Sequence, residues 1–66
     1  MKSNIGNLID EIGPSFRGLW KSVLFISGEK EERWSVTYLL DKEMVETAYL
    51  CNPAAALRAA LKELKS

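Results

Sequence analysis

The 66-residue chain contains no histidine and only one cysteine, Cys51. Zinc sites are built from clustered cysteine and histidine side chains, and a cysteine nucleophile needs a neighbouring base, so neither chemistry is predicted. A single cysteine cannot close a disulfide within the chain, and we expect Cys51 to be a small, buried apolar side chain. The sequence therefore predicts no metal and no cofactor.

Long hydrophobic runs are also missing. No segment approaches the roughly 18 apolar residues that cross a membrane, and the first residues, MKSNIGNLIDEIG, lack the apolar stretch of a signal peptide. The lack of a disulfide framework fits a reducing compartment. We therefore expect a cytoplasmic protein that has no membrane partner.

Neither sign of charge is in excess, because nine basic residues balance nine acidic ones. Proteins that bind nucleic acid irrespective of its sequence usually carry a positive excess, which displaces counterions from phosphates. The composition therefore disfavours nucleic acid as a partner, although it does not exclude a local basic face.

Carboxylates remain as groups that could carry catalysis or bind a hard cation. They gather in three places: Asp10-Glu11, Glu29-Glu31-Glu32 and Asp41-Glu43. None of these groups has the ligand spacing of a calcium loop, and so short a chain hardly forms a substrate cleft. The segment GPSFRG is not a phosphate loop, because no Lys-Ser/Thr follows it. We predict that the protein is not an enzyme and has no small-molecule substrate.

What the chain does contain is typical of one small folded domain, residues 1–66, with 47% hydrophobic and 27% charged residues. Apolar residues with the spacing of one helix face predict a helix over residues 4–12; they are Ile5, Leu8, Ile9 and Ile12. Ser3 or Asn4 can cap this helix, and Gly13-Pro14 ends it. Asn52 as N-cap and Pro53 as the first helical residue predict a second helix that reaches Leu64.

Strands are predicted between the two helices. Residues 14–22 are expected to form a turn or a short 3₁₀ piece, and residues 23–26 a first strand. The charged segment GEKEER, residues 28–33, is predicted to be a hairpin loop. Alternation over residues 34–40 predicts a second strand, and Asp41-Lys42 a tight connection. Residues 43–51 favour a third strand, with a short helix as the alternative.

The predicted fold is therefore α+β, in the order α-β-β-β-α, with a three-stranded antiparallel meander and both helices on one face. This element order resembles that of the double-stranded-RNA-binding domain. That family binds duplexes through lysines at the start of its second helix and through the loop between its first two strands. Here the corresponding segments read NPAAALRAALKEL and GEKEER, so both contact points are missing. The resemblance therefore implies a protein that acts through other proteins.

Two helices can cover only one face of the sheet. We expect Val23 and Phe25 to point inward, together with Trp34 and Tyr38 of the second strand, which leaves apolar side chains on the other face. The predicted interface residues are Leu24, Ile26, Leu39, Met44 and Leu50. Contiguous exposed apolar surface usually marks an interface. The leading hypothesis is thus a non-catalytic adaptor, inhibitor or accessory protein that binds another protein or itself as a homodimer. If the helices instead straddle the sheet, no such patch exists.

The alternative hypothesis is nucleic-acid binding. The second helix carries a basic row, Arg58, Lys62 and Lys65, which a solvated helix face also explains. Aromatic side chains could stack on unpaired bases. Core packing is the favoured role of these aromatics, because they supply much of the buried surface of a small domain; they are Trp20, Trp34, Tyr38 and Tyr49.

Overall fold

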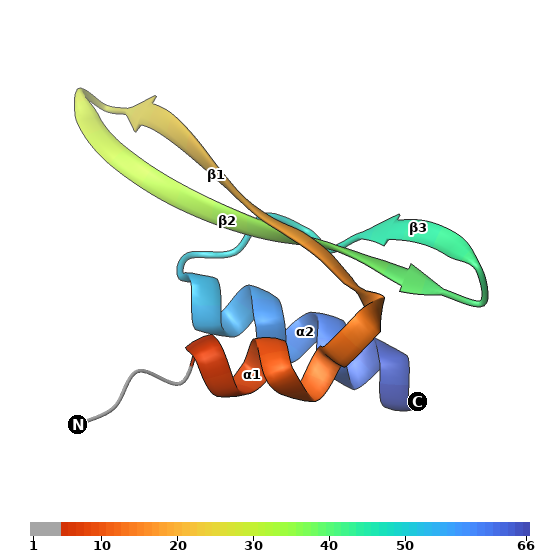
Figure 1. Cartoon of the computed structure of the whole chain (residues 1–66). Helices are drawn as coiled ribbons and strands as arrows, with labels where there is room; N and C mark the ends of the chain where they lie inside the picture. The colour runs from red at the N-terminus through yellow and green to blue at the C-terminus, as the bar shows by residue number, and fades with distance from the viewer. Residues whose placement is uncertain (1–4) are drawn as a thin grey trace.

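The computed structural model describes residues 5–66 and contains two helices on one face of a three-stranded sheet (Figure 1). In chain order the elements are α1 (Ile5–Ile12), the 3₁₀ turn η1 (Gly13–Ser15), β1 (Phe16–Ile26), β2 (Glu29–Leu40), β3 (Glu43–Glu46) and α2 (Pro53–Lys65). This arrangement confirms the predicted α+β fold and its element order. The predicted capping of α1 by Ser3 or Asn4 lies outside the described residues.

The sheet is an antiparallel meander in the order β1-β2-β3. The pairing of β1 with β2 runs from the Ile26–Glu29 pair to the Phe16–Tyr38 pair, whereas β2 and β3 share four pairs. The long hairpin projects beyond the helices, as Figure 1 shows at its upper left. We call this projecting part, residues 23–32, the arm.

The core lies between the sheet and the helices. Its fully or nearly fully buried apolar residues are Leu8, Ile12, Val36, Tyr38, Ala56, Leu57 and Ala60. The predicted apolar stripes therefore face inward on both helices, and the small alanines of α2 let it approach its neighbours closely. Asn52 caps α2 as predicted, since its side-chain oxygen accepts a hydrogen bond of 2.7 Å from the backbone N–H of Ala55.

The hairpin turn is much shorter than the predicted loop over residues 28–33. Only Ser27 and Gly28 form the turn, with φ of 53° and 79°, and β2 begins at Glu29. Two consecutive positive φ angles match the right-handed twist of a hairpin. The charged residues that follow form a strand because they pair with β1, and their charges are tolerated there because both faces of the arm are open to water. The loop prediction was wrong for this reason.

The first strand begins earlier than predicted, at Phe16 rather than Val23. The pairing register shifts between Phe16 and Gly18, so the strand starts with an irregularity rather than a separate turn. A Cβ at Gly18 would lie 3.2 Å from Nε1 of Trp20. Glycine at this position is therefore explained by the close approach of the indole ring.

The third strand is shorter than the predicted span 43–51, and the alternative of a helix there is wrong. After Glu46 the chain leaves the regular ladder and returns in a single bridge between Leu50 and Trp34. The backbone N–H of Thr47 donates to the carbonyl oxygen of Val36 over 3.0 Å, and its Oγ1 accepts from the N–H of Val36 over 2.9 Å. Between the Thr47–Val36 contact and the Leu50–Trp34 bridge, the segment after β3 has one residue more than the part of β2 opposite it. This extra residue forms a bulge.

The bulge changes which side chains are buried around it. Leu50 is directed toward the core, against which it packs, and its neighbour Cys51 is exposed. The expectation of a buried Cys51 was therefore wrong. Ser35 is fully buried here, and its hydroxyl donates to the carbonyl oxygen of Thr47 over 2.7 Å.

Tyr38 provides a test of the core. Its side chain is fully buried, and its hydroxyl has no hydrogen-bond partner within residues 5–66. An unpaired buried hydroxyl costs about 1–3 kcal/mol. We therefore expect Tyr38→Phe to raise the free energy of unfolding by about 1 kcal/mol, measured by urea denaturation. Tyr49→Phe, at an exposed position, is the matched control and should change it little. A loss of stability in Tyr38→Phe would contradict the prediction.

Candidate interaction surface

The predicted interface residues divide between two sides of the sheet. Side chains opposite each other in an antiparallel pair share a face, and neighbours along a strand alternate. Because Val36 and Tyr38 face the helices, Leu39 faces away from them, together with its partner Met44. The same alternation places Leu24, like Ile26, on this outer face.

Leu50 is the exception among the predicted interface residues. The sequence suggested that it points outward, but its bridge to Trp34 brings it to the helix side, where it packs against the core. The bulge after Glu46 shifts the alternation by one residue, which explains the error.

The arm exposes apolar side chains on both of its faces. The exposed fractions are 43% for Val23, 43% for Leu24, 73% for Phe25 and 49% for Ile26. We call these four residues the apolar run. Val23 and Phe25 point to the helix-facing side of the sheet, as predicted. They are nevertheless exposed, because the helices do not reach them, so the expectation that the helices cover them was wrong. A 13-residue helix spans about 20 Å, whereas the 11-residue β1 spans about 36 Å.

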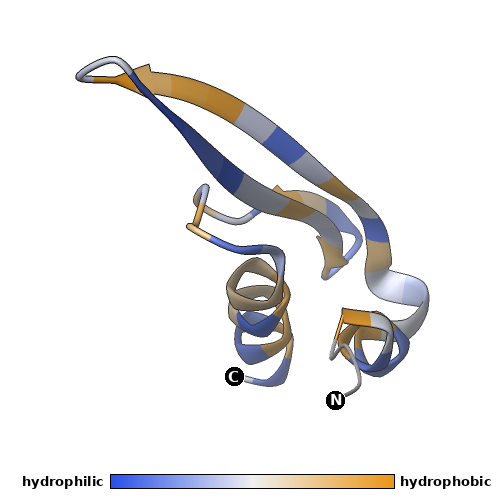
Figure 2. Cartoon of the chain, turned by 90° about the vertical axis from the view of Figure 1, so that its left-hand side faces the viewer, coloured by the Kyte–Doolittle hydropathy of each residue, from blue (hydrophilic) through white to orange (hydrophobic). Residues whose placement is uncertain are grey.

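The apolar run lies on an edge strand, and the part of β2 paired with it is charged. Within residues 5–66, β1 pairs with β2 on one side only, so its other side is an open edge. Opposite the run, β2 carries Glu29, Lys30, Glu31 and Glu32. Figure 2 shows this contrast, with β1 orange and β2 blue near the hairpin turn. The exposed apolar surface is therefore concentrated along one strand rather than spread over a whole sheet face.

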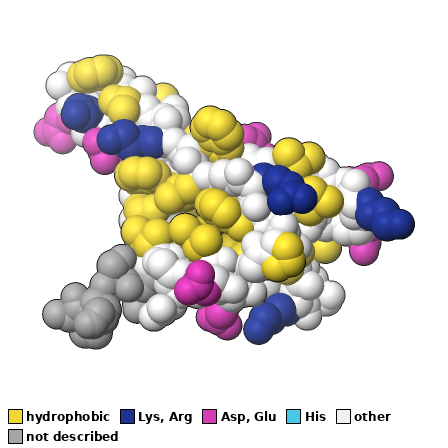
Figure 3. All heavy atoms as spheres, viewed as in Figure 1, with side chains coloured by type: hydrophobic (Ala, Val, Ile, Leu, Met, Phe, Trp, Pro, Cys, Tyr) yellow, Lys and Arg dark blue, Asp and Glu magenta, His cyan; other side chains and the backbone are white. Residues whose placement is uncertain are grey.

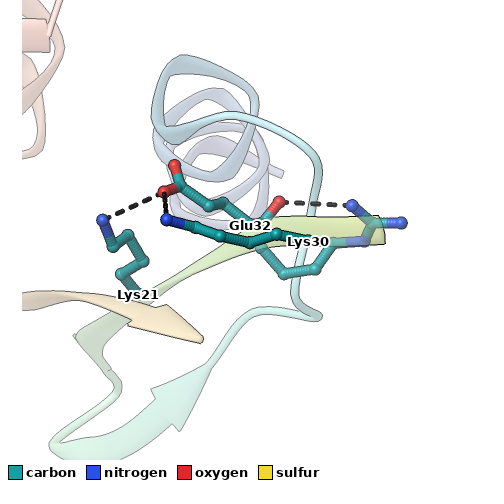
Figure 4. A network of polar contacts seen from close by, with 4 residues as sticks. Lys21, Lys30 and Glu32 are labelled. Carbon is teal, nitrogen blue, oxygen red and sulfur yellow. Dashed lines mark hydrogen bonds and ion pairs between the residues drawn. The ribbon is translucent and has the colours of Figure 1, made fainter. Parts of the chain in front are cut away.

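Ion pairs occupy the helix-facing side of the arm. Nζ of Lys21 and Nζ of Lys30 lie 3.3 Å and 4.0 Å from the same Oε2 of Glu32 (Figure 4). Nζ of Lys21 also lies 5.4 Å from the ring centroid of Trp34. Exposed pairs of this kind contribute about 0–1 kcal/mol each. Their main effect is to direct the side chain of Lys21 toward β2 and away from the open edge.

A second apolar area lies on the outer face, formed by Trp20, Leu39 and Met44, which we call the outer patch. Nε1 of Trp20 donates to Oγ1 of Thr37 over 2.8 Å, which ties the indole to β2 beside Gly18. Trp20 is 54% exposed and Met44 63%. Within residues 5–66 no helix covers this face (Figure 1). In the side-on view of Figure 3, hydrophobic side chains lie at the tip of the arm and between the arm and the helices.

The aromatic residues differ in their surroundings. Tyr38 is buried and Trp34 packs partly buried against the core, as expected of core aromatics. The same expectation was wrong for Trp20 and Tyr49, which are exposed. Trp20 is exposed because the alternation of side chains along β1 points it away from the helices. The sequence did not indicate on which face of the sheet Trp20 lies, because residues 14–22 were not predicted to be a strand.

The basic row lies on the exposed surface of α2. Arg58, Lys62 and Lys65 are all exposed, and Nζ of Lys65 lies 3.8 Å from Oε2 of Glu11 on α1. Since α2 packs on the helix side and Trp20 lies on the outer face, the basic row and this aromatic do not form one continuous surface. Nucleic-acid contact at the basic row stays a prediction without a structural observation that favours it.

Other kinds of site have no counterpart in the part of the chain that the structure describes. Residues 5–66 hold no group of three or more acidic or cysteine side chains placed to bind a metal ion, and they line no pocket. Over the same residues, neither helix is long and apolar enough to span a bilayer.

The fold and surface together define a small α+β domain that presents an apolar edge strand and an uncovered sheet face. Comparison with known proteins adds no relative, since no protein family matches the chain and no curated protein or solved structure is significantly similar to it.

Proposed function

We propose that this chain is a non-catalytic protein that binds another protein through the arm, as an adaptor, inhibitor or accessory subunit. The observation that supports the proposal is the apolar run, four consecutive apolar side chains that are 43–73% exposed. Exposed apolar surface of this kind on a folded domain usually marks an interface. We further propose a reducing, cytoplasmic setting, in which the exposed thiol of Cys51 stays free.

The arm also has the shape of a binding element. It projects beyond the helices, so a partner can contact both of its faces and its open edge without meeting the rest of the domain (Figure 1). The charged residues of β2 border the apolar run, as polar rims border the apolar centre of protein interfaces. Phe25, at 73% exposed, is suited to anchor a partner, because aromatic side chains dominate binding energy at interfaces.

Site-specific photo-crosslinking tests this proposal. Benzophenone-alanine in place of Phe25 keeps an aromatic side chain and reacts with whatever protein lies against the arm. We expect crosslinks from this position in the cells that make the protein, and few from the same group at Arg58 on α2, which is the matched control. Equal yields at both positions, or none at position 25, would contradict the proposal.

A charge variant tests whether the apolar run itself supplies affinity. Leu24 and Ile26 lie opposite Glu31 and Glu29, so lysine at both positions creates opposite-charge pairs across the hairpin and keeps the arm folded. Glutamate would instead place like charges opposite each other. We expect Leu24→Lys with Ile26→Lys to weaken binding of the crosslinked partner at least about 100-fold, measured by calorimetry on purified proteins. Unchanged affinity in this folded variant would refute the assignment.

A further inference from the structure

We infer that the partner on the arm is a second copy of this chain, whose β1 pairs antiparallel with β1 about a two-fold axis to give one continuous six-stranded sheet. This inference rests on the proposed function and names its partner. Three features support it. They are the open edge of β1, the two-fold symmetric pairing that this edge permits, and the apolar surface area that two copies would hide.

The open edge of β1 has backbone groups that no other strand of residues 5–66 pairs with. Trp34 exchanges two backbone hydrogen bonds of 2.7 Å with Leu50, so its N–H and C=O point away from β1. Alternate residues of a strand point their backbone groups to opposite sides, so Arg33 bonds with its β1 partner Ser22. On β1 the N–H and C=O of Val23 therefore point to the open edge, as do those of every second residue along the strand.

The features with which proteins usually protect an edge strand are missing beside the apolar run. Proline, inward charges and bulges serve that purpose. Residues 22–26 carry no charge and no proline, and the register irregularity lies at the far end of the strand, near Gly18. The nearest lysine on β1, Lys21, is directed toward Glu32. An open, apolar edge of this kind is a template for pairing with another strand.

A two-fold axis suits this strand because its two ends are complementary. The start of β1 is covered by the helices, where Phe16 and Leu19 pack against the core, while its end carries the exposed apolar run. Antiparallel pairing brings the uncovered end of one strand beside the covered start of the other. The helix-facing side chain of Phe25 then lies next to the helix layer of the second copy. Because residues 22–26 are uncharged, no like charges meet at the axis.

The area available agrees with a weak dimer. Enclosed aromatic side chains bury roughly 150–250 Å² each, so an exposed fraction of 73% at Phe25 corresponds to about 150 Å². With the rest of the apolar run, two copies can hide at most about 800–1,000 Å² in total, below stable specific interfaces and in the range of weak, transient ones. We therefore expect a dissociation constant in the micromolar range.

Cysteine crosslinking tests the pairing directly. In a Cys51→Ser background, single cysteines replace each residue from Ser22 to Ile26 in turn, and Met44→Cys on the open edge of β3 is the control. Opposed residues of paired strands have Cα atoms about 4.5–5.5 Å apart, within disulfide range. We expect rapid disulfide dimers that peak at one β1 position, the residue on the two-fold axis. A peak at Met44→Cys, or equal slow oxidation at all positions, would overturn the inference.

A proline variant tests the role of the backbone. Val23→Pro removes an N–H at the open edge without removing a bond of the β1–β2 ladder, and Met44→Pro does the same on β3. Light scattering from about 1 µM to 1 mM should show dimerisation for the parent and Met44→Pro, and at least a tenfold weaker dimer for Val23→Pro. Circular dichroism checks folding. If Val23→Pro does not fold, the cysteine series decides the question.

The two proposals can fail separately. A parent chain that stays monomeric to about 1 mM overturns the second-copy inference. If the photo-crosslinker at Phe25 then captures a different protein, and the lysine variant weakens its binding, the proposed function still stands. If position 25 captures neither a second copy nor another protein, both proposals fail.

Discussion

Replacing Leu57 by alanine is expected to lower the free energy of unfolding by about 2–5 kcal/mol. Leu57 is fully buried on α2, and its side chain contributes to the core between helices and sheet. A domain of this length is stable by only about 3–10 kcal/mol. The variant should therefore be partly or fully unfolded near physiological temperature, which thermal and urea denaturation followed by circular dichroism will measure.

Leu24→Ala is the matched control for this prediction, because it removes the same atoms from a side chain that is 43% exposed on the arm. We expect it to cost less than about 1 kcal/mol. A similar loss in both variants would mean that the arm belongs to the cooperative core, contrary to the structure. The contrast also separates stability from binding, since Leu24→Ala should weaken self-association while the chain stays folded.

Thr47→Val is expected to lower the free energy of unfolding by about 1–3 kcal/mol. The hydroxyl of Thr47 accepts a hydrogen bond of 2.9 Å from the backbone N–H of Val36, and valine leaves that buried donor unpaired while keeping the side-chain volume. Urea denaturation measures the loss. Amide hydrogen exchange at Val36 should accelerate beyond what the global change in stability explains.

Thr47→Ser is the control, because it keeps the hydroxyl and loses only a methyl group, so the Val36 amide should remain protected. A second control is Thr37→Val, whose hydroxyl bonds the indole of Trp20 on the exposed outer face and should cost less. If Thr47→Val is as stable as the parent, the bulge after β3 is held by the backbone bonds at Thr47 and Leu50 rather than by the side chain.

Together these variants describe a domain with two separate parts. The core holds the helices on the sheet through few residues, so single truncations there should unfold the chain. The arm adds little to that core, because its apolar run lies beyond the reach of the helices. Substitutions in the arm should therefore change binding with little effect on folding, which makes the interaction experiments interpretable.

Local signals in the sequence determined the helices, their inward faces and the order of elements. Asn52 and Pro53 are correct starts for α2 because capping and the fixed φ of proline act over a few residues. The apolar spacing that predicted the first helix likewise needs no distant contact, and the outward placement of Leu24, Ile26, Leu39 and Met44 followed from period-two alternation. These parts of the fold and of the candidate interface could be predicted.

Only the tertiary structure decided which apolar side chains are buried. A charged segment such as GEKEER indicates a loop when read alone, and it is a strand here because β1 pairs with it across the Ser27–Gly28 turn. The burial of Leu50 and the exposure of Phe25 depend on a bulge and on the mismatch between a helix of about 20 Å and a strand of about 36 Å. Both are relations between distant elements, and no local pattern encodes them.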